Sequence, residues 1–323
     1  MKPLPRIAIV GARGIGRHHA KWFAHAGCEV VAIYGTTEAS ALSAAATLRD
    51  LFGFSGRAFH DWEQFRREGG FDACSVCSPA EEHWANCRDL AQDGKHLLCE
   101  KPLVWNWSYS SLELIQEATR LVEAAAHHGV LLGVNAQYPA ALEGFEALHR
   151  TLRGREPDYR ALTFTMATRG APRSPHGAAE VWVDLGPHPL AVIDRLAPGG
   201  VDWATLRHQD GPREVVLDFE WVSAARRLPV HIECRRTTDG TVKRELGNQD
   251  LVATYDGVNR DGEFVARVAA EGEEWIGPDL MRRSVESFLL AVRTDDPSHL
   301  LVNGLSGLRQ QEALVGIWDH CWK

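Results

Sequence analysis

The sequence predicts an α/β protein with a doubly wound parallel sheet in its N-terminal part and a mostly antiparallel sheet in its C-terminal part. In the first third of the chain, short β-branched runs alternate with Ala-rich amphipathic segments, which is typical of βαβ units. From Tyr159 onward, long alternating runs separated by polar turns indicate antiparallel strands with one solvated face. The length of 323 residues fits two domains at roughly 150 residues each.

The predicted elements follow one another in chain order. Parallel strands are expected at residues 6–10, 29–34, 73–77, 96–99 and 130–134, with helices at 18–26, 40–51, 82–92 and 112–127. Antiparallel strands are expected at residues 160–167, 213–221, 229–235 and 263–269, and helices at 280–293 and from 307 onward. The change of rhythm places the domain boundary near Asn135, which gives domains 1–135 and 136–323.

Composition excludes several classes of protein. Lys plus Arg number 35 against 43 Asp plus Glu, a formal charge of −8 with no basic block, which argues against nucleic acid as a partner. No signal peptide and no membrane-spanning run is evident, and seven scattered cysteines favour reduced thiols in a cytoplasm. Cys74 and Cys77 form a C-x-x-C, but they lie in a strand-like run without further ligands, so no metal site is expected.

A glycine-rich turn follows the first predicted strand and opens the first predicted helix. Its members are Gly11, Arg13, Gly14, Ile15 and Gly16. Such a turn brings backbone N–H groups and a helix N-terminus to a pyrophosphate, so it predicts a dinucleotide site, although a purely structural turn is the alternative. Arg13 occupies the usual middle glycine position, and a guanidinium is well suited to bind phosphate.

The end of the second predicted strand bears on the choice of cofactor. NAD-binding proteins carry a carboxylate there for the ribose hydroxyls, but this strand ends in Tyr34-Gly35-Thr36-Thr37, with no acid before Glu38. The hydroxyls of Thr36 and Thr37 together with Arg13 favour NADP(H), with NAD(H) as the alternative. Equally, the two threonines could simply start the next helix as an N-cap.

Three further motifs make the chain resemble the Gfo/Idh/MocA oxidoreductase family. They are Ser78-Pro79 with His83, the run from Gly94-Lys95-His96 to Glu100-Lys101-Pro102, and Asp184-Leu-Gly-Pro-His188. The resemblance spans nearly the whole chain, because the segment from Asn303 to Glu312 also fits the family. It implies an N-terminal Rossmann domain, a C-terminal α/β domain with an open sheet, and an active site between them.

The resemblance also implies roles for individual residues. Lys101, Asp184 and His188 are the expected catalytic residues, and Ser78, Pro79, His83, Glu100 and Lys101 the expected cofactor contacts. A histidine can exchange the substrate's hydroxyl proton near neutral pH, and a lysine can stabilise negative charge on the same oxygen. Asp184, four residues before His188, is expected to share its helical face and orient it. Taken alone, Asp184 and His188 are more often an ordinary pair on a helix, and Glu100 and Lys101 an ordinary surface pair.

The chain departs from the family beside the expected active site. Ala191 replaces a frequent Asp, and the bulky run from Ala178 to Trp182 replaces a frequent glycine run, which puts the usual sugar or inositol substrate in doubt. Gln137, Tyr138 and Trp182 are candidate substrate contacts, although core packing is the more common role of tryptophan.

The leading functional hypothesis is an NAD(P)-dependent dehydrogenase or reductase acting on a small polyol, sugar or related carbonyl or imine. The alternative is a cofactor-sensing or binding protein of the same fold. A short-chain dehydrogenase is excluded because no tyrosine is followed four residues later by lysine. A homo-oligomer is also expected, formed through an open sheet face that carries Val215, Leu217, Phe219 and Trp221. The alternative is that these four residues face the helices.

Overall fold

The structure, a computed structural model, describes residues 1–170 and 175–323. The chain divides into two compact units, each made of two segments. The first unit comprises Met1–Ala136 and Met281–Leu308, and the second comprises Gln137–Leu280 and Arg309–Lys323. None of the described helices is long and apolar enough to cross a membrane.

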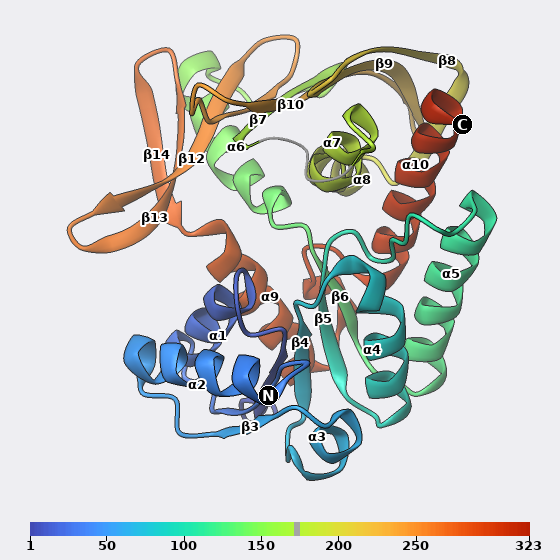
Figure 1. The fold of residues 1–323 in the computed structure, drawn as a ribbon. Coiled ribbons are helices and arrows are strands. Elements are labelled where there is room, and N and C mark those ends of the chain that lie inside the picture. Colours follow the sequence, from blue (N-terminus) through green and yellow to red (C-terminus); the bar gives the residue numbers. More distant parts are fainter. Residues whose placement is uncertain (171–174) are drawn as a thin grey trace. The chain divides into compact units, whose positions relative to one another are not determined.

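A six-stranded parallel sheet forms the centre of the first unit, in the order β3-β2-β1-β4-β5-β6 (Figure 1). Its strands are β1 (Ile7–Val10), β2 (Val30–Tyr34), β3 (Arg57–Phe59), β4 (Ala73–Val76), β5 (His96–Glu100) and β6 (Leu132–Asn135). Its helices are α1 (Gly16–His25), α2 (Glu38–Phe52), α3 (Trp62–Glu68), α4 (Ala80–Gln92) and α5 (Ser111–His127). The order reverses between β1 and β4, which confirms the predicted doubly wound sheet and creates a topological switch point.

A helix from the far C-terminal part of the sequence completes the core of the first unit. This is α9 (Leu280–Thr294), which precedes the short 3₁₀ helix η2 (Pro297–His299). The rings of Phe288 in α9 and Phe23 in α1 meet edge to face at 6.1 Å between centroids, and both side chains are fully buried. Val285 joins the same apolar cluster, together with Ile7 and Ile9 of β1.

An eight-stranded sheet dominates the second unit, in the order β14-β13-β12-β11-β7-β10-β9-β8. Its strands are β7 (Leu162–Arg169), β8 (Gly199–Gly211), β9 (Glu214–Ser223), β10 (Arg227–Thr237), β11 (Lys243–Gly247), β12 (Val252–Arg260), β13 (Glu263–Ala270) and β14 (Glu273–Pro278). Every neighbouring pair is antiparallel except β7 with β10, so the predicted mostly antiparallel sheet is confirmed.

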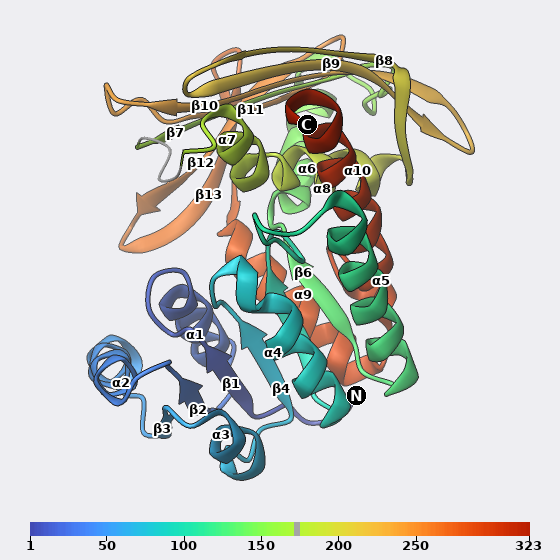
Figure 2. The same ribbon diagram turned by 45° about the vertical axis from the view of Figure 1, so that its right-hand side comes forward.

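Helices lie against one face of this sheet, which we call the inner face (Figure 2). They are α6 (Leu142–Arg153), α7 (Ala178–Leu185) and α8 (Pro187–Leu196), preceded by the 3₁₀ helix η1 (Tyr138–Ala141). The last helix of the chain, α10 (Gly304–Trp322), contributes its residues from Arg309 onward to this unit.

The alternation in β9 has a different role from the one expected of an open sheet face. Val215, Leu217, Phe219 and Trp221 are all at most 3% exposed, and the Trp221 indole N–H donates to the carbonyl oxygen of Ala197 at the end of α8. These four side chains therefore belong to the inner face and pack within the unit. The expectation that they form an open apolar face is wrong, because strict alternation marks a buried face without saying what covers it.

The opposite face of the sheet, which we call the outer face, carries ion pairs instead. Asp256 on β12 pairs with Arg267 on β13 at 2.8 Å, and His231 on β10 lies 2.8 Å from Asp218 on β9. Lys243 and Glu245 pair along β11. The outer face is thus polar.

Candidate functional site

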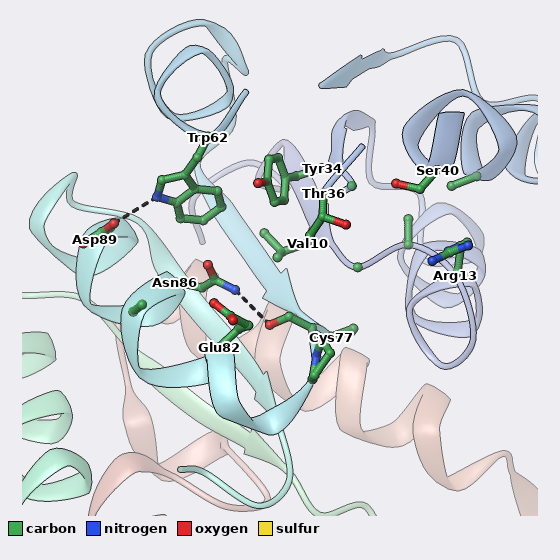
Figure 3. A pocket seen from close by; sticks show the side chains of 17 residues that line it. Val10, Arg13, Tyr34, Thr36, Ser40, Trp62, Cys77, Glu82, Asn86 and Asp89 are labelled. Carbon is green, nitrogen blue, oxygen red and sulfur yellow. Dashed lines mark hydrogen bonds between the residues drawn. The ribbon is translucent and has the colours of Figure 1, made fainter. Parts of the chain in front are cut away.

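A cavity of about 500 Å³ opens at the carboxyl ends of β1, β2 and β4, where the order of the parallel sheet reverses (Figure 3). Ligands of doubly wound sheets bind at this place because the strand ends and helix N-termini leave a crevice there. The lining residues are Val10, Gly11, Ala12, Arg13, Tyr34, Gly35, Thr36, Ser40, Ala44, Trp62, Cys77, Ser78, Pro79, Glu82, Ala85, Asn86 and Asp89. All of them belong to the first unit.

The glycine turn is shaped by close backbone contacts. A Cβ atom on Gly11 would lie 2.6 Å from the carbonyl oxygen of Cys77, and one on Gly16 would lie 2.2 Å from the carbonyl oxygen of Gly11. Gly11 and Gly14 also have φ angles of +76° and +55°, in the left-handed region that favours glycine. The turn therefore requires these glycines, and it brings the N-terminus of α1 to the cavity. Ile15 precedes α1 and is 40% exposed.

Arg13 lines the cavity and is exposed. Within the part of the chain that the structure describes, its guanidinium takes part in no hydrogen bond or ion pair. A guanidinium without a carboxylate beside it can bind a phosphate through two N–H groups.

Three neighbouring residues in the segment after β2 have different roles. Thr36 lines the cavity, whereas Thr37 is the N-cap of α2 and its hydroxyl accepts the backbone N–H of Ser40 at 3.2 Å. Gly35 passes close to α2, since a Cβ there would lie 2.7 Å from Ser40 Oγ and 3.0 Å from the Ala41 nitrogen. A side chain at position 35 would therefore crowd the start of α2, and Thr36 is the next residue that lines the cavity.

Two aromatic rings and two polar side chains form a wall that the sequence did not reveal. The rings of Tyr34 and Trp62 meet at 5.0 Å, and Trp62 donates its indole N–H to Asp89 at 2.9 Å. Asn86 donates to Ser78 Oγ at 2.9 Å, which ties α4 to the loop after β4 (Figure 3). These residues give the cavity the apolar body and few fixed polar groups that suit a nucleotide base and its ribose.

His83 lies behind the cavity wall. It is buried, and its ring nitrogens lie 2.8 Å from the carbonyl oxygen of Pro102 and 2.9 Å from that of Ser78. Burial lowers the pKa of His83. The side chain therefore joins the loop that carries Ser78 and Pro79 to the loop that carries Lys101, and does not face the cavity itself.

Glu100 and His19 form a buried ion pair beneath the glycine turn. Glu100 Oε1 lies 2.8 Å from His19 Nε2 and accepts Asn135 Nδ2 at 2.6 Å, while His19 Nδ1 lies 2.8 Å from Ser75 Oγ. Burial raises the pKa of Glu100, but the hydrogen bond and charge of His19 outweigh it and bring this pKa to about 2. Burial also lowers the pKa of His19, yet Cys77 and Glu100 raise it to about 10.

This network holds the start of the segment with the expected catalytic lysine. The backbone N–H of Lys101 donates to Glu100 Oε2 at 3.3 Å, and Lys101 is partly exposed. Ser284 on α9 donates to Asn135 Oδ1 at 2.6 Å, which links α9 to the same cluster. Glu100 therefore holds the backbone of Lys101 in place and does not line the cavity.

In the second unit, Asp184 and His188 lie on successive helices. Asp184 is the second-last residue of α7 and His188 is the second residue of α8. Gly186, between the two helices, has a right-handed helical conformation. Asp184 accepts a charged hydrogen bond from Arg236 on β10, a partner that the sequence did not suggest. The ring of His188 lies 4.4 Å from that of Tyr138, between centroids.

The candidate substrate contacts separate into two groups. Gln137 and Tyr138 line a smaller cavity of about 160 Å³ in the second unit. Trp182 is fully buried on α7, and its indole N–H donates to the carbonyl oxygen of Leu314 at 3.0 Å. Trp182 is a core residue, and this placement excludes the stacking contact with a substrate that the sequence suggested.

The large cavity has a size and a lining that suit a nicotinamide cofactor. Its volume falls within the range of about 300–1,000 Å³ for cofactor sites. The bare backbone of Gly11 and the N-terminus of α1 match a pyrophosphate and its charge, and the guanidinium of Arg13 is available for a further phosphate. Among the described residues, no cluster of His, Cys, Asp and Glu could hold a metal ion.

Comparison with protein families gives one match. Residues 5–136 match the Gfo/Idh/MocA model described as "Oxidoreductase family, NAD-binding Rossmann fold". Residues 5–136 are therefore similar to the NAD-binding domain of the Gfo/Idh/MocA oxidoreductase family, as the sequence motifs predicted. No significant match to a curated protein was found.

Solved structures of low sequence identity share the fold of this chain over nearly its whole length. UDP-N-acetylglucosamine 3-dehydrogenase from Acidithiobacillus ferrooxidans is 19% identical, with a TM-score of 0.73 and 98% of each chain covered. Scyllo-inositol dehydrogenase from Lactobacillus casei is 14% identical, with a TM-score of 0.70 and coverage of 97% of this chain and 95% of that chain. A 3-ketoreductase from Actinomadura kijaniata, solved with NADP, is 18% identical, with a TM-score of 0.68 and coverage of 97% and 96%.

Proposed function

We propose that this chain is an NAD(P)-dependent dehydrogenase or reductase that acts on a small polyol, sugar or related carbonyl or imine. The observation that carries the proposal is the cavity at the switch point of the family's NAD-binding domain, with its required glycines and the N-terminus of α1. A nicotinamide held there would supply the hydride chemistry. The chain must then supply proton transfer and charge stabilisation at the substrate oxygen.

Lys101 and His188 are the residues proposed for these two tasks. The imidazole of His188 takes or returns the hydroxyl proton, and Lys101 Nζ stabilises negative charge that develops on the same oxygen. Asp184, itself held by Arg236, supports His188 as a positioning residue. Glu100 and His83 position the backbone on either side of Lys101, as their contacts with Lys101 N–H and the Pro102 carbonyl suggest.

Turnover tests this assignment once a substrate has been found in a panel of polyols, aldoses and their oxidised forms. Lys101→Ala and His188→Ala should each reduce kcat by about 10²–10⁴-fold, the range for a positioned acid or base, while the Kd for NADPH stays near that of the wild type. Near-normal turnover by His188→Ala would make His188 structural. A wild type that binds NADPH but converts nothing in the panel would favour the cofactor-sensing alternative.

We further propose that NADP(H) is preferred over NAD(H). The support is the unpaired guanidinium of Arg13 beside Thr36 in the cavity lining, with no acid at positions 35 to 37 to repel a 2′-phosphate. Arg13→Gln should weaken NADPH binding by about 10-fold or more, the loss of a charged hydrogen bond, and leave NADH binding nearly unchanged. Arg17→Gln is the matched control, because Arg17 is an exposed arginine on α1 outside the cavity lining. Equal losses for both cofactors would contradict the preference.

We also propose that the chain forms a homo-oligomer through the outer face of the eight-stranded sheet, and that it acts in the cytoplasm. No described helix lies against the outer face in Figures 1 and 2, which supports the first statement. Its ion pairs imply a polar contact. The seven cysteines all carry free thiols, which supports a reducing compartment.

A further inference from the structure

We propose that the smaller cavity of the second unit binds an anionic group of the substrate, a carboxylate or a phosphate, and that Arg244 recognises it. This inference rests on the proposed oxidoreductase function, which it extends from neutral sugars to sugar acids or sugar phosphates. The cavity has a volume of about 160 Å³, and Gln137, Tyr138, Arg244, Tyr255 and Phe264 are among its lining residues. At about 30 Å³ per water molecule, this space holds roughly five waters and is large enough for one compact anion.

Arg244 stands on the inner face of the sheet, where charge is unusual. On β11 it lies directly opposite Met166 of β7, and Leu246 lies opposite Phe164. Directly opposed residues share a face, and Met166, Leu246 and Phe164 are all at most 2% exposed. Arg244 is partly buried, so its guanidinium loses part of its hydration, and an anion or hydrogen-bond acceptors that replace this water stabilise it.

A second arginine on the inner face, Arg236, has hydrogen-bond acceptors for its guanidinium. Arg236 on β10 lies opposite Thr168 of β7. Thr168 is two residues from Met166, so Arg236 points to the same face of the sheet as Met166. It donates to Thr168 Oγ1 at 2.8 Å and to the carboxylate of Asp184. Within the described residues, by contrast, Arg244 makes no hydrogen bond or ion pair, and its buried Nε has no acceptor.

The surroundings of Arg244 contain donors that suit an anion and link the cavity to His188. The ring of Tyr138 lies 5.0 Å from that of Tyr255 and 4.4 Å from that of His188, so the three rings form one continuous wall. The Tyr255 hydroxyl has only the thioether of Met166 as its described partner, a weak acceptor at 3.2 Å. The charge of Arg244 opposes the rise that burial causes in the pKa of Tyr255, which indicates that the guanidinium lies near this hydroxyl.

Two acids also line the cavity, but they do not neutralise Arg244. Asp256 lies opposite Arg267 in the β12–β13 pair, on the outer face, and its two carboxylate oxygens accept Arg267 at 3.1 and 2.8 Å. Asp279, which directly follows β14, takes part in another interaction. Among the described residues, none accepts a hydrogen bond from Arg244. An anionic substrate group would supply the missing acceptors through two parallel N–H···O bonds.

This arrangement also predicts selectivity. A neutral sugar would leave the buried Nε of Arg244 unsatisfied, so sites of this kind discriminate against ligands that lack the matching group. The acid or phosphate would anchor one end of the substrate. The neighbouring wall of Tyr138 would then direct the rest toward His188.

Binding of three probes to the cofactor-free protein tests the proposal without any need for turnover. D-Glucuronate, D-glucose 6-phosphate and D-glucose are titrated by calorimetry into the wild type, Arg244→Gln and Arg244→Lys. Arg227→Gln is the matched control, because it removes an arginine from the outer face of the same sheet whose partners, Asp202 and Glu220, do not line the cavity. We expect the wild type to bind at least one anionic probe 10-fold or more tighter than glucose, and Arg244→Gln to abolish this difference. Arg244→Lys should retain part of it, and Arg227→Gln all of it.

The relative affinities of the two anionic probes distinguish a carboxylate from a phosphate as the bound group. Thermal unfolding provides the second readout, since Arg244→Gln removes an unsatisfied charge and should unfold no earlier than the wild type. Equal affinity of the wild type for all three probes, or unchanged anion binding by Arg244→Gln, would overturn the proposal. Failure of the proposed oxidoreductase function would appear separately, as anion binding without any turnover.

Discussion

Glu100→Gln is the substitution that tests most sharply how the buried ion pair supports the first unit. The change keeps the shape of the side chain and an oxygen that can accept His19 Nε2 and Asn135 Nδ2, but it removes the negative charge 2.8 Å from the imidazole. Removing one partner of a buried pair costs about 3–5 kcal/mol, because the other charge stays buried without compensation. In a domain of this size, each kcal/mol of lost stability lowers Tm by about 2–4 °C, so Glu100→Gln should lower Tm by about 6–20 °C.

The same pair makes the stability of the first unit depend on pH in a defined way. His19 has its pKa raised to about 10, so its contribution is complete below its unfolded value near 6.5 and is lost as the pH rises through 10. Glu100 has its pKa lowered to about 2, so its contribution is complete above its unfolded value near 4.5 and is lost as the pH falls through 2. The wild type should therefore be most stable between about pH 4.5 and 6.5 and should weaken steadily toward pH 10.

Scanning calorimetry at pH 6, 8 and 9.5 measures both effects. Glu100→Gln should lower Tm most at pH 6 and should flatten the decline toward pH 9.5. Glu68→Gln is the control, because Glu68 pairs with Arg57 at the surface and its pKa is also lowered to about 2, yet solvent screens the pair and Tm should barely change. A Glu100→Gln variant that unfolds within 2 °C of the wild type and keeps its pH dependence would refute the reasoning.

Two further predictions concern cofactor choice and assembly. Thr36→Asp should shift preference from NADPH toward NADH by about 1–3 kcal/mol, because the new carboxylate repels a 2′-phosphate and accepts ribose hydroxyls. Gly35→Asp should instead disturb the start of α2, where its Cβ would meet Ser40, and a clean switch at position 35 would contradict this packing argument. Sedimentation velocity should show an oligomer at low salt that dissociates in 1 M NaCl, since the outer face carries screened ion pairs. Thr165→Arg, on the outer face of β7, should give a monomer, and a monomeric wild type would end the proposal.

The fold could be predicted from the sequence to the extent that each element leaves a local pattern. The fully apolar run of Ile7–Val10 and the capped, Ala-rich segment of Glu38–Phe52 are examples, and the structure places both elements within a few residues of their expected bounds. β3 and α3 were missed because three and seven residues are too few to show a period. The placement of Met281–Leu308 in the first unit depends on long-range packing of Phe288 against Phe23, which has no local signal.

The candidate sites show the same limit. Gly11 could be found because its backbone conformation excludes other residues, whatever the tertiary context. Trp62 and Arg244 could not, since a tryptophan in a short helix and an arginine in an alternating strand acquire their roles only from what the fold places beside them. Trp182 illustrates the converse, because a residue next to a motif can still be a core residue.

Titration of the protein with NADPH and NADH is the most direct test of the central claim that the cavity at the switch point holds a nicotinamide dinucleotide. The wild type is compared with Ala85→Trp, which fills the cavity from α4, and with Ala46→Trp, which adds the same side chain to an exposed site on α2 outside the lining. We predict saturable binding of NADPH by the wild type and by Ala46→Trp, and none by Ala85→Trp. A wild type that binds neither cofactor, or an Ala85→Trp variant with unchanged affinity, would contradict the claim.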